Sequence, residues 1–496
     1  MPSEQISNYD INQHLLTDEK CLIPTHLMYV KETKTMFWWD DGIGVFKEIH
    51  HWDNRVESYI YDYCNTRLGI KKTFSSGNIY NQHTDYIKTR IPLYEKIALN
   101  KSKASNYIVL DDCVINMNTL EVEDKPEKPS ATYKPVHHLP YTKEEYLTQT
   151  PTRFLQYLDE VIVFEGGGVD KSTQAFLQAM TGYLLDITIA QEASFFLMGN
   201  GQNGKSMYIN ILNDLFPLSL RSTSTLEDLT KNRFGGSNLA NKRVNVVDED
   251  ESEKINSGKL KALVTGSFMN VERKHQDSFS YAPHVKFVFS LNHTSRFDRI
   301  DRGLTRRIFN IPFYRTILES EKDYELPKKL KAEMPGILRW AIEGRKMINE
   351  KGSLLAMASD QVNDEQKKMS MTVSSAIAFI MENFEVSKSE QYYFASSQLY
   401  DWYKSWSFHE GKMAVGLRRF KDETSNYFFP NQKKRDNRRH IQGKRVRVLF
   451  YKIKNDAPFL EDLNYDLHKI IEHQGSSSQE QTNMPIKQQK YESMPF

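Results

Sequence analysis

The stretch FFLMGNGQNGKSMYIN at residues 195–210 decides the fold of the central part of this chain. Four apolar residues, Phe195 to Met198, predict a buried strand, and the apolar periodicity from Met207 to Leu215 predicts a helix. The loop between them has the pattern G-x-x-x-x-G-K-[ST] in the strand–loop–helix context that this phosphate-binding motif needs. A glycine-rich turn without a ligand is the competing interpretation, and the flanking elements weigh against it.

Each residue type of this loop has a task on a nucleoside triphosphate. Glycines let backbone N–H groups approach the phosphates, and the helix N-terminus adds its positive end. Lys205 places a charge on the β- and γ-phosphates, and Ser206 offers its hydroxyl to Mg²⁺. With ATP and Mg²⁺ as the expected cofactors, the predicted ATP-binding residues are Gly199, Asn200, Gly201, Gln202, Asn203, Gly204, Lys205 and Ser206.

Acidic residues follow a second predicted strand. The apolar run at 243–247 leads directly into Asp248, Glu249, Asp250 and Glu251. In an ATPase site one carboxylate after such a strand reaches Mg²⁺ through water, and its neighbour polarises the attacking water. We assign these roles to Asp248 and Glu249 in that order, with Asp250 as the base if the strand runs longer. A solvated helix start also favours acids, and it suits the last two better than the first two.

A third apolar strand, at 287–291, ends in Asn292. An amide in this place can orient water near the γ-phosphate without adding charge. Further on, Arg306 and Arg307 stand directly before another apolar run. Such a pair can reach the nucleotide of a neighbouring subunit as an arginine finger, and a surface salt bridge is the alternative.

Composition sets the outer limits of the interpretation. A chain of 496 residues has room for about three domains. The net charge is +2, so any affinity for nucleic acid must come from local patches. Three cysteines, far apart, fit a reducing compartment and exclude a Cys-rich zinc module. A polar N-terminus and the lack of long apolar runs predict a cytoplasmic protein without a membrane partner.

The C-terminal part predicts a DNA-binding domain. Helical patterns at 372–384, 396–406 and 414–428 precede a basic stretch and a strand at 445–451, which suggests a winged helix-turn-helix. Residues 411–456 hold 14 basic residues against 4 acidic ones, a local charge of +10. A solvated basic face is the alternative. The predicted DNA contacts here are Arg418, Arg419, Lys433, Lys434, Arg435, Arg438 and Arg439.

These patterns predict an α/β fold with several segments. A P-loop ATPase core stands between a small α+β domain and the winged-helix domain. The predicted segments are 1–124, the α+β domain; 125–150, a proline-containing linker; 151–353, a helical lead-in plus the ATPase; 354–371, a second linker; 372–460, the winged helix; and 461–496, a polar tail expected to be disordered.

The motifs together resemble those of the superfamily-3 helicases of the AAA+ class. Within that class, residues 195–313 are similar to the primase–helicase branch of phages, plasmids and other mobile elements, with its poxvirus-type relatives. The motifs stand in the family's order: GNGQNGKS, the strand with Asp248-Glu249, LKALVTG at 260–266, the strand ending in Asn292, and Arg306-Arg307 before IPF. The resemblance covers about residues 105–345.

The resemblance implies an ATP-driven hexameric ring that translocates on DNA and separates its strands. One subunit would supply Lys205, Ser206, Asp248 and Glu249, and the next would supply Arg306 or Arg307. Lys274 and His275 match a Lys-His pair that this superfamily projects into its channel, where lysine contacts phosphate and histidine offers a flat, hydrogen-bonding contact.

We therefore expect a DNA helicase and replication initiator of a phage, plasmid or genomic island in a bacterial host. Single-stranded DNA would pass the channel, and duplex or origin DNA would bind the C-terminal domain. No convincing metal-binding carboxylate pair precedes the ATPase, so a separate primase or host replication proteins are further expected partners. A non-unwinding, ATP-regulated DNA-binding switch and a packaging-type ATPase remain alternatives.

Overall fold

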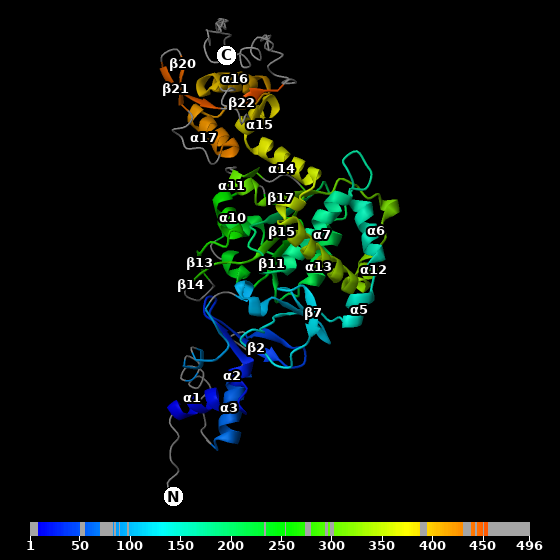
Figure 1. Cartoon of the computed structure of the whole chain (residues 1–496), viewed down its shortest axis with the longest axis vertical. Helices are drawn as coiled ribbons and strands as arrows, with labels where there is room; N and C mark the ends of the chain where they lie inside the picture. The colour runs from blue at the N-terminus through cyan, green and yellow to red at the C-terminus, as the bar shows by residue number, and fades with distance from the viewer. Residues whose placement is uncertain are drawn as a thin grey trace. The chain divides into compact units, whose positions relative to one another are not determined.

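The computed structural model shows two compact units, residues 1–299 with 303–367, and residues 300–302 with 368–496 (Figure 1). Each unit is described by itself. The residues that the structure describes are 8–49, 55–69, 83, 86–88, 90–96, 99–232, 235–252, 254–272, 279–292, 296–297, 302–386, 394–429, 438–441, 444–449 and 451–454. Among the helices within these ranges, none has the length and apolar character of a membrane span.

A five-stranded, all-parallel sheet forms the centre of the first unit, with the strand order β10-β11-β15-β9-β17. Every residue of β11, β15 and β17 is buried, which is the pattern of a parallel sheet covered on both faces. The three strands predicted around the phosphate loop are confirmed. The strands are β9 (Ser194–Met198), β10 (Arg221–Ser222), β11 (Val244–Val247), β15 (Lys286–Leu291) and β17 (Ile308–Pro312).

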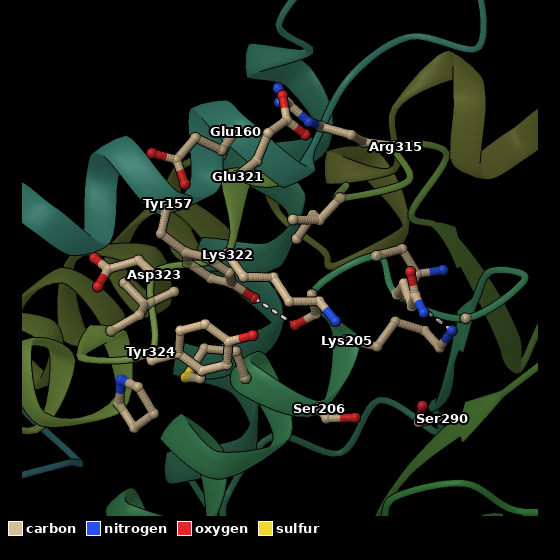
Figure 2. Close-up of a pocket in the computed structure, with 18 of the residues that line it drawn as sticks. Tyr157, Glu160, Lys205, Ser206, Ser290, Arg315, Glu321, Lys322, Asp323 and Tyr324 are labelled. Carbon is tan, nitrogen blue, oxygen red and sulfur yellow. Dashed lines mark hydrogen bonds and ion pairs between the residues drawn. The ribbon is translucent and has the colours of Figure 1, made fainter. Parts of the chain in front are cut away.

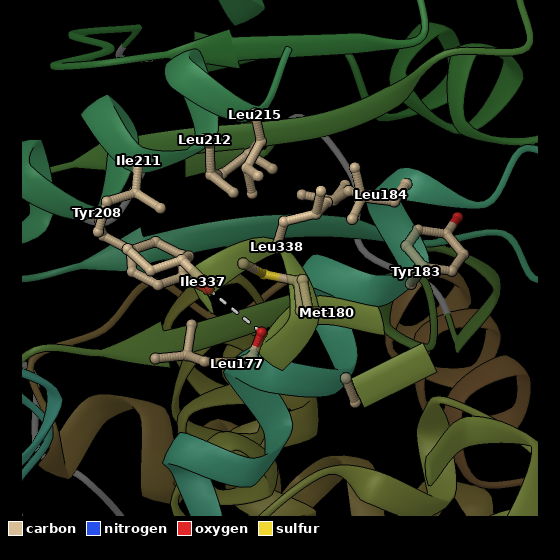
Figure 3. Close-up of a cluster of buried hydrophobic side chains, with 14 of the residues drawn as sticks. Leu177, Met180, Tyr183, Leu184, Tyr208, Ile211, Leu212, Leu215, Ile337 and Leu338 are labelled. Atoms are coloured by element: carbon tan, nitrogen blue, oxygen red, sulfur yellow. Dashed lines mark hydrogen bonds between the residues drawn. The ribbon is translucent and has the colours of Figure 1, made fainter. Parts of the chain in front are cut away.

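Three helices build the core on one face of this sheet (Figure 3). They are α7 (Lys171–Leu185), α8 (Lys205–Leu215) and α13 (Met334–Lys351). Leu177, Met180, Leu212 and Leu338 are fully buried between them.

Glycines bring α7 and α13 into close contact. A Cβ at Gly182 would collide with the backbone of Ala341 and Arg345, and one at Gly344 would collide with the carbonyl group of Gln178. The two helices therefore touch backbone to backbone at these points, and no larger residue fits there.

Two small sheets precede the parallel sheet in the chain. The first has the order β3-β2-β1-β4 and contains a hairpin whose turn includes Gly42, and the second has the order β7-β6-β5-β8. Their elements are α1 (Asn8–Thr17), α2 (Ile23–His26), β1 (Leu27–Val30), β2 (Thr35–Asp40), β3 (Val45–Ile49), α3 (Arg55–Arg67), β4 (Tyr94–Glu95), η1 (Leu99–Lys101), η2 (Lys103–Ser105), β5 (Tyr107–Val109), β6 (Cys113–Asn116), β7 (Glu121–Asp124) and β8 (His137–His138).

Two segments in this region carry more structure than the sequence indicates. The polar start of the chain contains α1, in which Ile11 and Leu15 are buried. The expected linker at 125–150 contains β8, which pairs with β5, and the helix α5 (Lys143–Thr148). Pairing with a strand far upstream leaves no mark in local composition, so four prolines alone suggested a linker.

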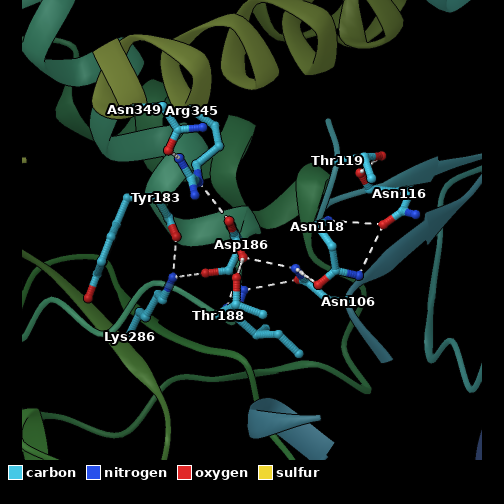
Figure 4. A network of polar contacts seen from close by, with 11 residues as sticks. Asn106, Asn116, Asn118, Thr119, Tyr183, Asp186, Thr188, Lys286, Arg345 and Asn349 are labelled. Atoms are coloured by element: carbon cyan, nitrogen blue, oxygen red, sulfur yellow. Dashed lines mark hydrogen bonds and ion pairs between the residues drawn. The ribbon is translucent and has the colours of Figure 1, made fainter. Parts of the chain in front are cut away.

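A buried polar network joins the second small sheet to the amino edge of the parallel sheet (Figure 4). The Asp186 carboxylate accepts from Asn106 Nδ2 at 2.9 Å and from Arg345 Nε at 2.6 Å. Lys286, the first residue of β15, donates to the carbonyl oxygens of Tyr183 and Asp186, and its Nζ lies 3.8 Å from the centre of the Tyr183 ring. Each of these polar groups is thereby satisfied inside the protein.

The charges in this network shift one another's protonation. Burial lowers the pKa of the Lys286 ammonium to about 7, although the Asp186 carboxylate opposes the shift. Burial alone would raise the pKa of Asp186, but the charge of Lys286 and hydrogen bonds from Thr188 and Arg345 bring it below its usual range. Arg243, directly before β11, is also fully buried and donates to the Ser105 carbonyl oxygen.

The remaining elements of the first unit connect these layers. They are α6 (Thr152–Val161), α9 (Leu226–Lys231), η3 (Gly235–Leu239), β12 (Lys254–Ile255), α10 (Ser257–Val264), β13 (Met269–Val271), β14 (Phe279–Tyr281), β16 (Arg296–Phe297), α11 (Arg302–Thr305), η4 (Glu319–Glu321), α12 (Leu326–Ala332), η5 (Leu355–Met357) and α14 (Asp360–Val373), which continues into the second unit.

The second unit contains three helices followed by an antiparallel hairpin, as the sequence predicts, with the short strands β18 and β19 between the first and the second helix. Its core contains Phe379, Tyr403, Trp406 and Phe420. The elements are α15 (Ser375–Asn383), β18 (Phe384–Val386), β19 (Phe394–Ala395), α16 (Ser396–His409), α17 (Leu417–Phe428), β20 (Arg438–Ile441), β21 (Lys444–Leu449) and β22 (Tyr451–Ile453).

Candidate nucleotide-binding site

A cavity of about 720 Å³ lies where β9 and β15 end and α8 begins. The phosphate loop from Gly201 to Met207 lines one side, together with Glu249, Ser290 and Asn292. The opposite side is formed by α6 and by the segment 315–327, which joins β17 to α12. Figure 2 shows Lys205, Ser206 and Ser290 on one side, and Asp323 and Tyr324 on the other. Parallel strands bring their carboxyl ends to one edge, which explains why residues so far apart in sequence meet here.

The phosphate loop holds its lysine by three contacts. Lys205 Nζ donates to the Gly199 carbonyl oxygen at 2.7 Å, to Asn203 Oδ1 at 3.0 Å and to Asn292 Oδ1 at 2.9 Å. Burial lowers the pKa of this ammonium to about 8, while the charges of Asp248 and Glu249 work against the shift. A polyanion in the cavity would raise this pKa again, because it favours the charged form of the ammonium. A phosphate-binding site needs a lysine that responds in this way.

Glycines are required at two positions of this loop. Gly204, which precedes α8, has φ +87°, and a Cβ there would lie 2.7 Å from Val161 Cγ1. A Cβ at Gly199 would lie 2.8 Å from the Phe313 carbonyl oxygen and would overlap the Asn203 amide. The loop therefore runs close against α6 and β17. The Tyr157 hydroxyl group fixes it further by donating to the Gly204 carbonyl oxygen at 2.8 Å.

The two predicted acids lie in different places around the cavity. The Ser206 hydroxyl group donates to Asp248 Oδ1 at 3.2 Å, so these two oxygen atoms already form a pair suited to a hard cation such as Mg²⁺. Glu249 is exposed and lines the cavity, and its backbone has φ +54°. A glutamate in this left-handed conformation costs roughly 1–2 kcal/mol, so the turn is strained at the residue that faces the cavity.

The alternative base, Asp250, points away from the cavity. Its side chain is 1% exposed, and its two carboxylate oxygens accept from the Leu226 amide at 2.7 Å and the Ser252 amide at 2.9 Å. Both oxygen atoms are therefore engaged in the protein. Of the two acids considered for the base, Glu249 has the geometry for it.

Ser290 belongs to this site although its sequence position did not suggest it. The residue stands two positions before Asn292 on β15, so the two side chains point to the same face of the strand. Its hydroxyl oxygen is buried beside the cavity and makes no hydrogen bond within the described residues. Buried hydroxyl groups normally have partners, so this atom is a candidate contact for bound water or ligand. The signal available in the sequence was the period of two that ends in Asn292.

The second side of the cavity was also missed by sequence reasoning. The Ile317 amide donates to the Gln202 carbonyl oxygen at 2.7 Å, which ties the segment 315–327 to the phosphate loop. Arg315 pairs with Glu321 at 2.9 Å, and the Tyr324 ring is 76% exposed at the rim. Ile317, Tyr324, Leu326 and Pro327 line this side among charged residues, and apolar and aromatic side chains of this kind suit a planar ring. The segment has no regular period, so only its place in space identifies it.

The two candidate finger arginines occupy different environments. Arg307 is buried and paired with Glu192, with 2.7 Å between Arg307 Nε and Glu192 Oε2, whereas Arg306 is exposed. Both precede β17 and so lie at the amino edge of the sheet, about 16 Å from the edge that carries Lys205. Arg306 therefore cannot serve the cavity of its own chain, but it is free to meet another molecule.

The predicted DNA contacts are described in part. Lys274, His275, Lys433, Lys434 and Arg435 lie outside the described residues. Arg438 and Arg439 lie on β20, opposite Arg447 and Val446 of β21. On α17, Arg419 Nε donates to Glu423 Oε1 at 2.6 Å, whereas Arg418 is exposed at the first turn. Arg419 is thus bonded to a residue of its own helix, whereas the neighbouring Arg418 faces solvent.

Comparison with known proteins places the site within a recognisable sequence region. Residues 197–307 match a family described as "Family of unknown function (DUF5906)". The matched region begins within β9 and ends before β17, and it contains Lys205, Asp248, Glu249 and Asn292. It covers less than half of the chain.

A putative helicase, L207/L206, of Acanthamoeba polyphaga mimivirus is 27% identical over 182 residues, which are 35% of this chain and 18% of that protein. The chain thus spans under a fifth of the length of this curated relative. Two apo structures of the NrS-1 C-terminal region are each 12% identical to this chain. The first has a TM-score of 0.40, and the match covers 86% of this chain and 96% of that chain. The second has a TM-score of 0.42, and the match covers 90% of this chain and 100% of that chain. The chain is thus weakly similar, over about a third of its length, to a putative viral helicase.

Proposed function

We propose that this protein is an Mg²⁺-dependent ATPase of the helicase type, which couples ATP hydrolysis to movement on DNA. The observation that carries the proposal is the constellation around Lys205, whose Nζ is held by the Gly199, Asn203 and Asn292 oxygens at the mouth of a 720 Å³ cavity. The five parallel strands support the AAA+ architecture that the sequence resemblance implies. The match to a putative viral helicase supports the same class.

The residues of the site fit a magnesium nucleotide. Ser206 Oγ and Asp248 Oδ1 supply adjacent hard oxygen ligands, and Mg²⁺ would neutralise charge on the phosphates when bound. Lys205 binds the phosphates, Glu249 takes the proton of the attacking water, and Asn292 orients that water. The segment 315–327 and α6 hold the nucleoside and exclude solvent from the reacting groups.

The proposed site is completed by a neighbouring subunit. Arg306 is exposed at the amino edge of the sheet, away from its own cavity, and a guanidinium group supplied in trans can stabilise the charge of the transition state. A ring of identical subunits meets this condition at every interface, and the expected ring is a hexamer. Arg307 is not available for this role, because Glu192 holds it within its own chain.

DNA is the proposed partner of both units. A charge of +10 over residues 411–456 gives the second unit the electrostatic footprint of a nucleic-acid binder, and the order of α15, α16, α17 and the β20–β21 hairpin supports a winged helix. Arg418, at the exposed start of α17, is the proposed base-reading residue. Lys274 and His275 are proposed to contact the translocating strand.

ATP-dependent unwinding of a forked DNA duplex tests the proposal. The wild type should separate the strands only with ATP and Mg²⁺. The Lys205→Ala variant should neither hydrolyse ATP nor unwind the duplex. Hydrolysis without unwinding would favour an ATP-regulated DNA-binding switch or a packaging-type motor. Unwinding that survives Lys205→Ala would remove ATP from the mechanism.

Mixing two inactive variants tests the shared site. Arg306→Ala and Lys205→Ala subunits are each expected to be inactive alone, and their mixture should regain part of the ATPase activity, because some interfaces combine an intact phosphate loop with an intact arginine. Failure to regain activity at any ratio would place the whole site within one chain.

A further inference from the structure

Glu249 is held in a conformation that its own chemistry disfavours. Its φ of +54° lies in the left-handed region, where a residue with a Cβ is strained. Such a conformation persists only when the surroundings impose it from both sides. On the upstream side the constraint is β11, because Val247 is locked in register with Phe289 of β15. The downstream constraint must come from the residues that follow Glu249.

Asp250 supplies that downstream constraint through three hydrogen bonds. Its amide donates to the Ser290 carbonyl oxygen at 2.8 Å, which returns the chain to β15 directly after Glu249. Its Oδ2 accepts from the Leu226 amide at 2.7 Å, and its Oδ1 accepts from the Ser252 amide at 2.9 Å. Hydrogen bonds to a buried carboxylate are strong, and they fix the aspartate in two directions at once.

One of the two donors to the Asp250 carboxylate, the Leu226 amide, lies on a separate element, whereas the Ser252 amide belongs to the same turn. Leu226 is the first residue of α9, and the next amide, that of Glu227, donates to Ser252 Oγ at 2.9 Å. The turn that carries Glu249 is therefore anchored to the start of a helix whose Leu226 side chain is fully buried. Because α9 is fixed by its own packing, the anchor does not move with the strained turn.

We propose that Asp250 is a positioning residue, which holds the Glu249 carboxylate at the reacting edge of the cavity without touching nucleotide. The inference rests on the proposed ATPase function of the site and gives Asp250 a role other than the base for which the sequence made it the alternative. When the two bonds of the Asp250 carboxylate are removed and only its amide bond to the Ser290 carbonyl oxygen remains, Glu249 relaxes toward an ordinary negative φ, and its carboxylate leaves the position from which it can reach water at the γ-phosphate. The phosphate loop and the nucleoside side of the cavity are unaffected, because they share no contact with Asp250.

Graded substitution of Asp250 tests this proposal. Asp250→Asn keeps the shape but turns one acceptor into a donor, and Asp250→Ala removes both acceptors. We expect kcat for ATP to fall about 100-fold in each, since a displacement of about 1 Å costs that much. KM for ATP and the Kd for Mg-ADP should stay within about twofold of wild type, because nucleotide contacts are intact. A defect in the overall fold would weaken nucleotide binding as well.

Two neighbouring substitutions serve as matched controls. Glu251→Gln changes the adjacent, exposed acid, and Ser252→Ala removes the bond to Glu227 but leaves the Asp250 carboxylate in place. Both should keep kcat within about twofold of wild type. Ser252→Ala should lower the thermal midpoint somewhat, because α9 loses part of its cap. A large loss of kcat in Ser252→Ala would assign the effect to the capping of α9 instead.

Glu249→Gln separates this inference from the proposed function. If the wild type hydrolyses ATP and Glu249→Gln does not, the proposed function stands, and normal kcat in Asp250→Asn overturns the positioning role alone. If the wild type does not hydrolyse ATP, both fail together. If the Asp250 variants lose Mg-ADP binding along with activity, Asp250 supports the fold in general and the specific role is overturned.

Discussion

The two edges of the parallel sheet hold buried cations in opposite ways. At the amino edge, Lys286 donates to two carbonyl oxygens and lies beside Asp186, which is itself bonded to Asn106 and Arg345. At the carboxyl edge, Lys205 donates only to neutral oxygen atoms, and Glu249, one of the two acids near it, lines a cavity.

We interpret this difference as a division between buried charges that serve stability and those that we propose to serve a ligand. In the amino-edge network, Asp186, Lys286 and Arg345 each have an opposite charge or a carbonyl oxygen next to them, whereas Nε of the nearby Arg243 makes no hydrogen bond within the described residues. The carboxyl edge instead contains a strained glutamate and, within the described residues, the unpaired hydroxyl group of Ser290. Unfinished bonding of this kind marks the edge where something else must bind.

The largest effect on activity is expected for Glu249→Gln. Loss of a general base lowers kcat by about 10²- to 10⁴-fold, whereas the free energy of unfolding should change little, because the Glu249 side chain is exposed. Steady-state ATPase assays and urea unfolding of the same samples measure the two quantities. ATP turnover at the wild-type rate in Glu249→Gln would mean that another residue is the general base. It would also weaken the functional difference between the two edges of the sheet.

The amino edge should respond in the reverse way to Asp186→Asn. The variant leaves Lys286 and Arg243 without their nearest anion, and breaking a buried pair costs about 3–5 kcal/mol of unfolding free energy. Mg-ADP affinity of the folded fraction should be unchanged. Asp124→Asn, on the exposed end of β7, is the control and should cost under about 0.5 kcal/mol.

The difference in unfolding free energy between the wild type and Asp186→Asn should depend on pH, because the pKa of Asp186 is lowered. A carboxylate whose pKa is lowered by folding stabilises the protein above its unfolded pKa, and this stabilisation is lost as the pH falls toward the folded pKa. The difference in unfolding free energy between the wild type and Asp186→Asn should therefore become smaller below about pH 4. A gap that persists unchanged in acid would mean that packing, not charge, accounts for the loss.

Nucleotide affinity should depend on pH through Lys205. Bound phosphates favour the charged ammonium, so the complex holds more protons than the free protein above pH 8, and affinity must fall as the pH rises through that value. We expect the Kd for Mg-ADP to rise about tenfold from about pH 7 to about pH 9. Lys205→Arg stays charged over this range and should abolish the slope, and an equal slope in that variant would assign it to another group.

The smallest effect is expected for Glu249→Gly, which removes the strain at the carboxyl edge. Relief of the left-handed penalty, about 1–2 kcal/mol, outweighs the added chain entropy of glycine, about 0.5–1 kcal/mol. Urea unfolding should therefore show a stability gain of about 0.5–1 kcal/mol in a variant that cannot hydrolyse ATP. A loss of stability would mean that Glu249 is not strained.

The carboxyl edge could be predicted from the sequence largely because its signals are local. Lys205 and Ser206 belong to one contiguous motif, and Asp248 and Asn292 each follow an apolar run directly. In a parallel sheet such positions converge without further information. The order of the helices in the second unit could likewise be predicted from the helical period of the apolar residues and from the residues that interrupt it.

The parts that sequence reasoning missed depend on contacts between distant residues. Asp250 could be distinguished from Glu249 only by the start of α9, because its partner Leu226 lies 24 residues upstream. The amino-edge network is invisible for the same reason, since Asp186 and Asn106 are 80 residues apart. Arg306 and Arg307 are adjacent in sequence, and only the position of Glu192 separates the exposed one from the buried one.

The glycines that join α7 and α13 have a consequence for how this protein can move. Without side chains between their backbones at Gly182 and Gly344, the two helices lack the deformable layer that lets packed helices slide. We expect them to act as one stiff block against the sheet. If the proposed ATPase moves during turnover, the motion would then fall to other connections, and one candidate is the segment 315–327, which lines the cavity and contacts the phosphate loop through Ile317.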